Sequence, residues 1–150
     1  MTEIPKEPPA IACPSAQPDW DGAQVFGVQT VAPGQGRRVG YLTAPVPVTP
    51  ELLAATGNAQ PAEVLRIAAP CMGTGCQHFD GSSCRLATRV ATMMEPVVAG
   101  LPRCAIRPVC RWFRQEGKAA CLRCPQIVTT MRDPTEHERL VATGVAAAAD

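Results

Sequence analysis

The pattern of hydrophobic and polar positions near the N-terminus predicts a β-hairpin. Two β-prone runs, residues 25–31 and 38–43, are separated by the segment Ala-Pro-Gly-Gln-Gly-Arg. Strand-forming runs joined by a short glycine-containing loop are typical of an antiparallel hairpin.

Helical patterns follow the hairpin. Thr49 followed by proline, and a second proline entry after Gln60, predict short helices over residues 49–57 and 60–70. Between Ser82 and Ala99, Leu86, Val90, Met93 and Val97 recur at helical spacing, and Pro96 should end or kink this helix. We therefore expect an α+β fold, a small irregular cysteine-rich domain stabilised by metal, with an N-terminal hairpin and several short helices around the metal centre or centres.

Composition divides the chain into three parts. Residues 1–12 are proline-rich and read as a flexible arm, residues 13–132 as one cysteine-rich domain, and residues 133–150 as a polar tail. Within the domain, the hairpin part is expected at residues 20–48 and the helical cysteine-rich part at residues 49–132. The chain contains 16 prolines but only six aromatic residues, so an aromatic core alone is not expected to stabilise it.

Eight cysteines in 150 residues need a specific explanation. The N-terminus does not have the pattern of a secretory signal, and no apolar run is long enough to span a membrane, so we expect a cytoplasmic protein. A reducing cytosol disfavours disulfides and favours metal or redox chemistry for clustered cysteines. Unligated buried cysteines are the structural alternative.

The spacing of the cysteines indicates metal ligation. Seven of them lie within 54 positions, and the last two form a C-x2-C pair, a spacing at which two thiolates can bind one centre. The predicted ligands are Cys13, Cys71, Cys76, Cys84, Cys104, Cys110, Cys121 and Cys124, with His78 as a possible replacement for one of them.

Helix geometry limits which cysteines can share a centre. An unbroken helix from Cys110 to Cys121 would separate its ends by roughly 16 Å, too far for one metal or cluster. A break at Gly117 would allow the last four cysteines to form one site and the first four to form another. The alternative is crossed ligation, in which neighbouring cysteines serve different clusters, and the spacing does not decide between the two.

The loop from Cys71 to Cys84 suits an anionic centre. Gly73 and Gly75 allow successive backbone N–H groups to point toward sulfur, and Cys84 lies at the start of a predicted helix, where a thiolate is favoured. His78 is a candidate ligand, but with eight thiols available the preferred interpretation is a partly buried histidine that donates to a backbone carbonyl.

Positive charge accompanies the cysteines. Residues 82–132 contain eight arginines and one lysine against two glutamates, a surplus of seven charges. Four thiolates around Zn²⁺ or a [4Fe-4S]²⁺ core leave a net charge of −2, so two such centres would offset about four of these charges. The arginines nearest the later cysteines, Arg103, Arg107, Arg111 and Arg123, are the candidate cofactor-binding cations. A solvated basic face is the alternative interpretation.

The irregular spacing favours one or two [4Fe-4S] clusters over structural zinc, which usually uses paired tight knuckles. The function expected is electron transfer or an accessory role to a partner enzyme, with the basic surplus steering a partner that has an acidic surface. A zinc module for protein or nucleic-acid interaction is the first alternative, although a net charge of +1 argues against strong nucleic-acid binding. The second alternative is an enzyme with an open iron. No catalytic residue set is recognised, and a non-enzyme is favoured.

Overall fold

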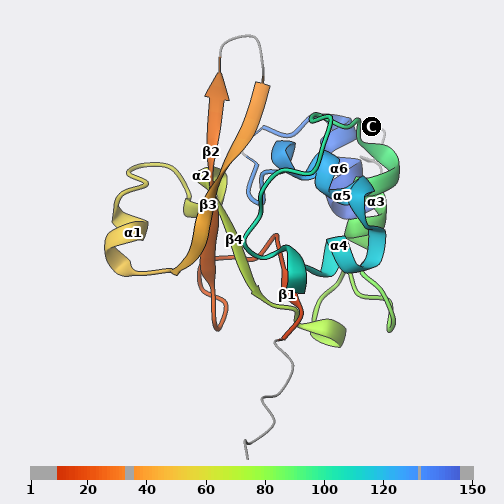
Figure 1. Cartoon of the computed structure of the whole chain (residues 1–150), viewed down its shortest axis with the longest axis horizontal. Helices are drawn as coiled ribbons and strands as arrows, with labels where there is room; N and C mark the ends of the chain where they lie inside the picture. The colour runs from red at the N-terminus through yellow and green to blue at the C-terminus, as the bar shows by residue number, and fades with distance from the viewer. Residues whose placement is uncertain (1–9, 33–35, 132, 146–150) are drawn as a thin grey trace, which may run out of the picture.

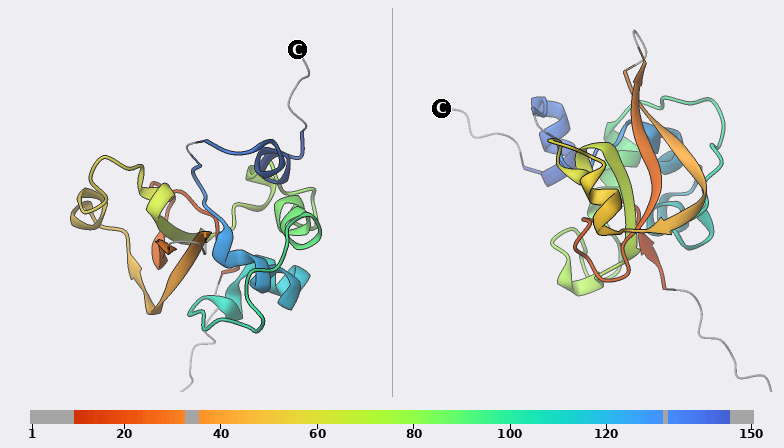
Figure 2. Two further views of the ribbon diagram at one scale, coloured as in Figure 1. Left: turned by 90° about the horizontal axis from the view of Figure 1, so that it is seen from above. Right: turned by 90° about the vertical axis from the view of Figure 1, so that its left-hand side faces the viewer.

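A computed structural model describes residues 10–32, 36–131 and 133–145. It shows a small α+β protein in which a four-stranded antiparallel sheet lies beside a group of short helices (Figures 1 and 2). The strand order is β1-β4-β2-β3. The strands are β1 (Ala12–Cys13), β2 (Gln24–Ala32), β3 (Gly36–Pro47) and β4 (Leu65–Pro70).

The helices divide between the two parts of the molecule. Figure 2 shows α1 and α2 beside the sheet, whereas α3 to α6 gather on the other side. The α-helices are α1 (Pro50–Ala54), α2 (Pro61–Val64), α3 (Arg85–Met93), α4 (Arg111–Glu116), α5 (Lys118–Arg123) and α6 (Glu136–Thr143). Three single-turn 3₁₀ helices are η1 (Gly73–Gly75), η2 (Arg107–Val109) and η3 (Cys124–Gln126).

The predicted hairpin is confirmed. Strands β2 and β3 pair along most of their length, from Gln24 opposite Pro47 to Ala32 opposite Gly36, with an irregularity between Val25 and Gly27. The loop at residues 33–35 lies outside the described residues. The expected helix after Thr49 is also present, because the Thr49 side chain accepts the Leu52 N–H at 3.1 Å and caps α1.

The predicted helix over residues 60–70 is wrong in its second half. The proline entry forms only the four residues of α2, after which the chain becomes β4 and pairs with both β1 and β2. Residues 65–69 of this strand are all buried, so the sequence lacks the alternation of polar and apolar residues that would predict a strand. A central strand covered on both faces cannot be distinguished from a buried helix by local periodicity.

Two hydrophobic clusters cover the two faces of β4. Leu65, Ile67 and Ala69 belong to the cluster on the side of α1, and Ala68 belongs to the cluster that contains Trp112 and the helices. Successive side chains of a strand point to opposite faces, so Arg66, like Ala68, faces the helical and cysteine-rich half.

Helices α3 and α4 were both predicted, and the backbone conformation at the end of α4 differs from the expected one. Helix α3 begins after Cys84 and ends at Met93, shortly before Pro96. Helix α4 ends at Gly117 as predicted; this glycine has φ +68° and ψ −147°, which lies outside the left-handed α region that the sequence analysis expected. The following helix, α5, then brings Cys121 back toward α4.

The C-terminal segment predicted as a polar tail contains α6, which packs on α3. Val141 is buried, and Arg89 of α3 donates to its carbonyl at 2.7 Å. Residues 1–9 of the predicted arm and residues 146–150 lie outside the description. Among the described residues, no helix has the length and apolar character needed to cross a bilayer.

Candidate metal centres

The eight cysteines lie in two groups of four, and each group lines its own cavity. None of the eight forms a disulfide. The first cysteine group consists of Cys13, Cys71, Cys76 and Cys84, and the second consists of Cys104, Cys110, Cys121 and Cys124. This is the division expected when the chain breaks at Gly117 rather than the crossed arrangement. Metal ligation by either group stays a prediction.

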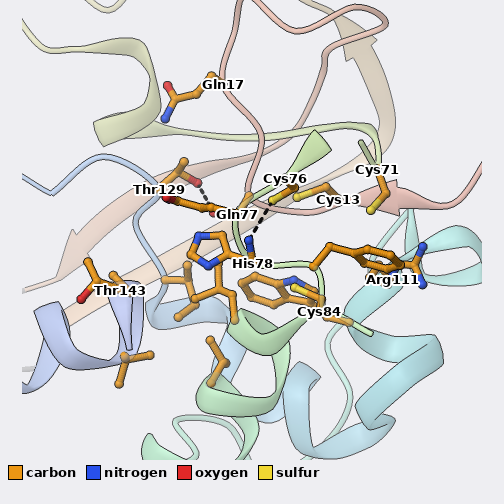
Figure 3. Close-up of a pocket in the computed structure, with 18 of the residues that line it drawn as sticks. Cys13, Gln17, Cys71, Cys76, Gln77, His78, Cys84, Arg111, Thr129 and Thr143 are labelled. Atoms are coloured by element: carbon orange, nitrogen blue, oxygen red, sulfur yellow. Dashed lines mark hydrogen bonds between the residues drawn. The ribbon is translucent and has the colours of Figure 1, made fainter. Parts of the chain in front are cut away.

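The sheet edge and the following loop assemble the first cysteine group (Figure 3). Cys13 in β1 is opposite Ala69 in β4, and Cys71 follows the end of β4, where its N–H donates to the Ile11 carbonyl at 2.7 Å. The 3₁₀ turn η1 then places Cys76, whose sulfur accepts the His78 N–H at 3.5 Å. Two residues far apart in sequence, Cys13 and Cys71, therefore become neighbours through strand pairing.

Cys84 is held from two sides. Before it, the Asp80 carboxylate accepts the N–H groups of Ser82 and Ser83 at 3.0 and 2.8 Å, which fixes the turn. From α4, the Gln115 amide binds both backbone groups of Cys84, accepting its N–H at 2.7 Å and donating to its carbonyl at 2.8 Å. The Cys84 sulfur accepts the Ala87 N–H at 3.4 Å, so this cysteine caps α3.

The second cysteine group is built around a tight helical turn. Cys110 is the N-cap of α4; its side chain accepts no capping hydrogen bond, but the backbone of Phe113 and Trp112 opposes the rise in its pKa. Cys121 lies in α5, and Cys124 follows at the end of that helix. Their approach to Cys110 requires the sharp change of direction at Gly117.

Burial favours the protonated form of five of the eight thiols. Burial raises the pKa of Cys13 and of Cys110, each to about 12, although backbone N–H groups oppose the shift. Burial also raises the pKa of Cys84, Cys104 and Cys121. Neighbouring thiols of the same group add to the increase at all five. A cation bound among them would remove this penalty, because thiolates then face positive charge.

Arg66 is a completely buried cation between the two cysteine groups. Its guanidinium donates to the carbonyl of Pro14, next to Cys13, at 2.9 Å and to the carbonyl of Cys124 at 2.7 Å. The pKa of Arg66 is raised overall: burial lowers it, and the Cys124 sulfur and the Tyr41 hydroxyl raise it once they ionise. A buried charge without an opposite charge costs several kcal/mol, so a thiolate at Cys124 would stabilise this guanidinium.

Arg66 and Tyr41 are site residues that the sequence analysis missed. Both lie in strands, outside the cysteine-rich segment; Tyr41 lines the second cavity together with Cys124, and Arg66 donates to the Cys124 carbonyl. The available signal was the position of Arg66 inside the otherwise apolar run Leu65–Ala69. A charged residue in such a run requires a buried partner.

Several buried donors around the cysteines have no acceptor. Five buried side-chain atoms lack a hydrogen-bond partner within the described part of the chain, and four of them are nitrogens. These four are Nε of Arg66, Arg107 and Arg111 and Nε1 of Trp112. Arg107 lines the second cavity, Arg111 the first, and Trp112 both. Unsatisfied buried donors are rare in native proteins, so each of these suggests an acceptor that the polypeptide does not supply.

The predicted cofactor-binding arginines have different surroundings. Arg107 lines the second cavity with Cys121 and opposes the rise in the pKa of that thiol, and Arg111 lies over the Phe79 ring at 5.4 Å beside the first cysteine group. Arg123 instead donates to the backbone carbonyls of Met94 and Ala119, at 2.6 and 2.8 Å. Arg103 is exposed.

His78 lines the first cavity with its ring turned toward α3. Its Nδ1 lies 3.2 Å from Arg89, so the expected donation from the ring to a backbone carbonyl is replaced at this nitrogen by a contact with a cation. Burial and the charges of Arg89 and Arg85 lower the pKa of His78, which favours the neutral ring. A neutral imidazole keeps the ability to bind a metal, and this role stays a prediction.

The two cavities differ in size. The first has a volume of about 630 Å³, and the second encloses about 20 Å³, room for about one water molecule or a bare ion. In the described ranges, no three or more histidine, cysteine, aspartate or glutamate side chains are arranged to hold a single metal ion. An eight-atom [4Fe-4S] core needs on the order of 200 Å³ if each atom occupies about as much space as liquid water, so the second cysteine group must move apart to hold one.

No protein-family model matches the chain, and neither curated proteins nor solved structures show significant similarity to it. Its function is therefore argued from the two cysteine groups and their surroundings.

Proposed function

We propose that this protein is an iron-sulfur protein in which each cysteine group holds a [4Fe-4S] cluster, and that it transfers electrons or serves as an accessory subunit of a partner enzyme. The observation that carries the proposal is the buried cation Arg66 between two sets of four thiols, where it donates to the carbonyls of Pro14, next to Cys13, and of Cys124. Two thiolate-bound clusters, each with a net charge of −2, would supply the negative charge that this guanidinium needs.

The local hydrogen bonds support cluster binding at both groups. Backbone groups oppose the rise in the pKa at Cys13, Cys84, Cys104 and Cys110, and the guanidinium of Arg107 opposes it at Cys121. Such donors stabilise thiolate and tune the reduction potential of a cluster. Four cysteines for four irons leave no open iron, so electron transfer is proposed rather than catalysis at the metal.

The exposed basic residues support an acidic partner surface. In the segment of predicted charge surplus, Arg103, Arg114 and Lys118 are exposed, and so is Arg85, which donates to the Gln77 carbonyl at 2.8 Å; Arg89 and Arg123 also bind backbone carbonyls. Only part of the surplus is therefore presented to solvent. The exposed part would steer a partner with the opposite charge.

Zinc at the second cysteine group is the alternative function. The small enclosed space there, about 20 Å³, suits a single ion better than an eight-atom core. A tetrahedral Zn²⁺ with four thiolates would give the same net charge and would also accompany Arg66. In that case the first group alone would carry a cluster.

Metal analysis separates these possibilities. We expect anaerobically purified protein to be brown, with about eight irons and eight acid-labile sulfides per chain and no stoichiometric zinc. Four irons, four sulfides and one zinc would support the mixed arrangement. Colourless protein that contains zinc only, and that takes up no iron and sulfide on anaerobic reconstitution, would contradict the iron-sulfur proposal.

A further inference from the structure

The first cavity is larger than one cluster requires. It runs from the first cysteine group to α3 and α6 and is bounded on another side by residues 15–20 (Figure 3). Of its 630 Å³, a [4Fe-4S] core would occupy on the order of 200 Å³. The remaining space, roughly 400 Å³, is within the range of small-molecule binding sites and could hold about a dozen non-hydrogen atoms.

The walls of this space are apolar and aromatic. Leu86, Val90 and Met94 contribute aliphatic surface from the α3 side, and Val141 contributes it from α6. Both tryptophans of the chain, one phenylalanine and His78 also line the cavity. Aromatic walls bind flat aromatic molecules well because the rings stack in offset or edge-to-face arrangements.

Two unsatisfied donors define the polar part of a ligand. The Nε of Arg111 and the Nε1 of Trp112 are buried without an acceptor, and Trp112 is 2% exposed. Among the other polar side chains of the lining, Ser15 bonds Thr129 at 2.9 Å and Gln17 bonds Thr130 at 3.5 Å. A ligand with an acceptor oxygen would satisfy the two unpartnered nitrogens.

Charge excludes an anionic ligand. A cluster with a net charge of −2 at the first cysteine group would balance the positive charge of Arg111 and repel a carboxylate or phosphate. The Glu138 carboxylate gives no reason to expect a cationic ligand, because it accepts the Thr135 N–H at 2.9 Å in the capping box of α6. These conditions favour a neutral molecule.

We propose that the cavity beside the first cysteine group binds a neutral aromatic carbonyl compound of the quinone class. The ring would lie between the aromatic and aliphatic walls, and a carbonyl oxygen would accept from Arg111 or Trp112. This inference rests on the proposed function for the charge at the first cysteine group. The shape and the two donors belong to the polypeptide and do not depend on it.

Duroquinone is a suitable probe because its ring carbons are fully substituted, which suppresses addition of thiols. Its matched control is durene, which has the same methylated ring without the oxygens. We expect isothermal titration of the anaerobically purified protein to show duroquinone binding at least tenfold tighter than durene. Equal affinity for the two, or no binding of duroquinone, would overturn the proposal.

Substitutions locate the binding. Ala142 is exposed and lines the cavity, so Ala142→Trp should obstruct it and weaken duroquinone binding more than tenfold, whereas Leu101→Trp, at an exposed position outside the lining, should not. Trp112→Phe removes one donor and should weaken binding roughly three- to tenfold. Unchanged affinity in both cavity variants would contradict the site.

Iron and sulfide are measured in the same samples. Binding without iron would contradict the proposed function while supporting the cavity as a ligand site. If iron and sulfide are present at the expected level but duroquinone does not bind, the quinone proposal is overturned and the iron-sulfur proposal is not affected.

Discussion

Cys84 and Cys110 occupy equivalent positions in the two cysteine groups, since each is the N-cap of a helix, although only the Cys84 sulfur accepts a backbone N–H of the first helical turn. Their surroundings differ. The first group borders a cavity of about 630 Å³, whereas the second borders one of about 20 Å³ that Phe26 and Tyr41 also line.

This difference in cavity volume predicts different roles for the two cysteine groups. Solvent access and nearby charge control the reduction potential of a cluster, and access also controls exchange with other molecules. The first cysteine group, which has the larger cavity, is the better site for exchange. The second connects the sheet to α4 and α5 through Cys124 and Arg66, so it should contribute more to folding.

The largest effect is expected from single cysteine substitutions, and one variant in each cysteine group is compared. Cys110→Ser should reduce iron to about four per chain and also lower the melting temperature strongly, because metal binding stabilises the folded state and Cys110 is buried in the main hydrophobic cluster. Cys84→Ser should lose a similar amount of iron with a smaller loss of stability. Iron analysis and circular dichroism melting measure both effects.

Arg114→Gln is the control for this pair, because Arg114 is exposed on α4. It should keep the full iron content and melting temperature. Equal destabilisation by the two cysteine variants would show that the second group has no special structural role.

The next effect is expected from Arg66→Met, which leaves the carbonyls of Pro14 and Cys124 without their donor. We expect a loss of about 3–5 kcal/mol in the free energy of unfolding. Removing a positive charge also makes reduction harder, so the reduction potential of the cluster at the second group should fall by roughly 50–100 mV. Denaturant unfolding and a redox titration followed by electron paramagnetic resonance measure these changes.

Arg103→Met removes the same charge from an exposed position and is the matched control. A shift of equal size in both variants would mean that net charge alone, and not the buried position of Arg66, affects the potential.

Local structural features could be predicted well from the sequence, whereas contacts between distant segments could not. The hairpin, the cap at Thr49 and the break at Gly117 depend on a few neighbouring residues whose conformational preferences are strong. Strand β4 could not be predicted in the same way, because a strand buried on both faces has no alternating pattern.

The candidate site shows the same limit. The length of a helix and one glycine, which are local facts, allowed this division of the cysteines as one of two arrangements, and the fold distinguishes them. Arg66 reaches the second group only because β4 pairs beside β2 and faces the helices, and the sequence does not specify that pairing. The unequal sizes of the two cavities also arise from side chains brought together by the whole fold.

The smallest effect is expected from Gly117→Ala, which tests whether the turn between α4 and α5 is specific to the second group. Gly117 has φ +68° and ψ −147°, and a Cβ there would meet no atom within 4 Å, so the cost is conformational rather than steric. We expect a loss of about 1–2 kcal/mol and faster release of metal from the second group to a chelator. Gly100→Ala is the matched control, since Gly100 also has open space but no positive φ, and it should change neither quantity. If Gly117→Ala instead accelerated metal release equally from both groups, the turn would act on the whole fold, and the two centres would not be independent.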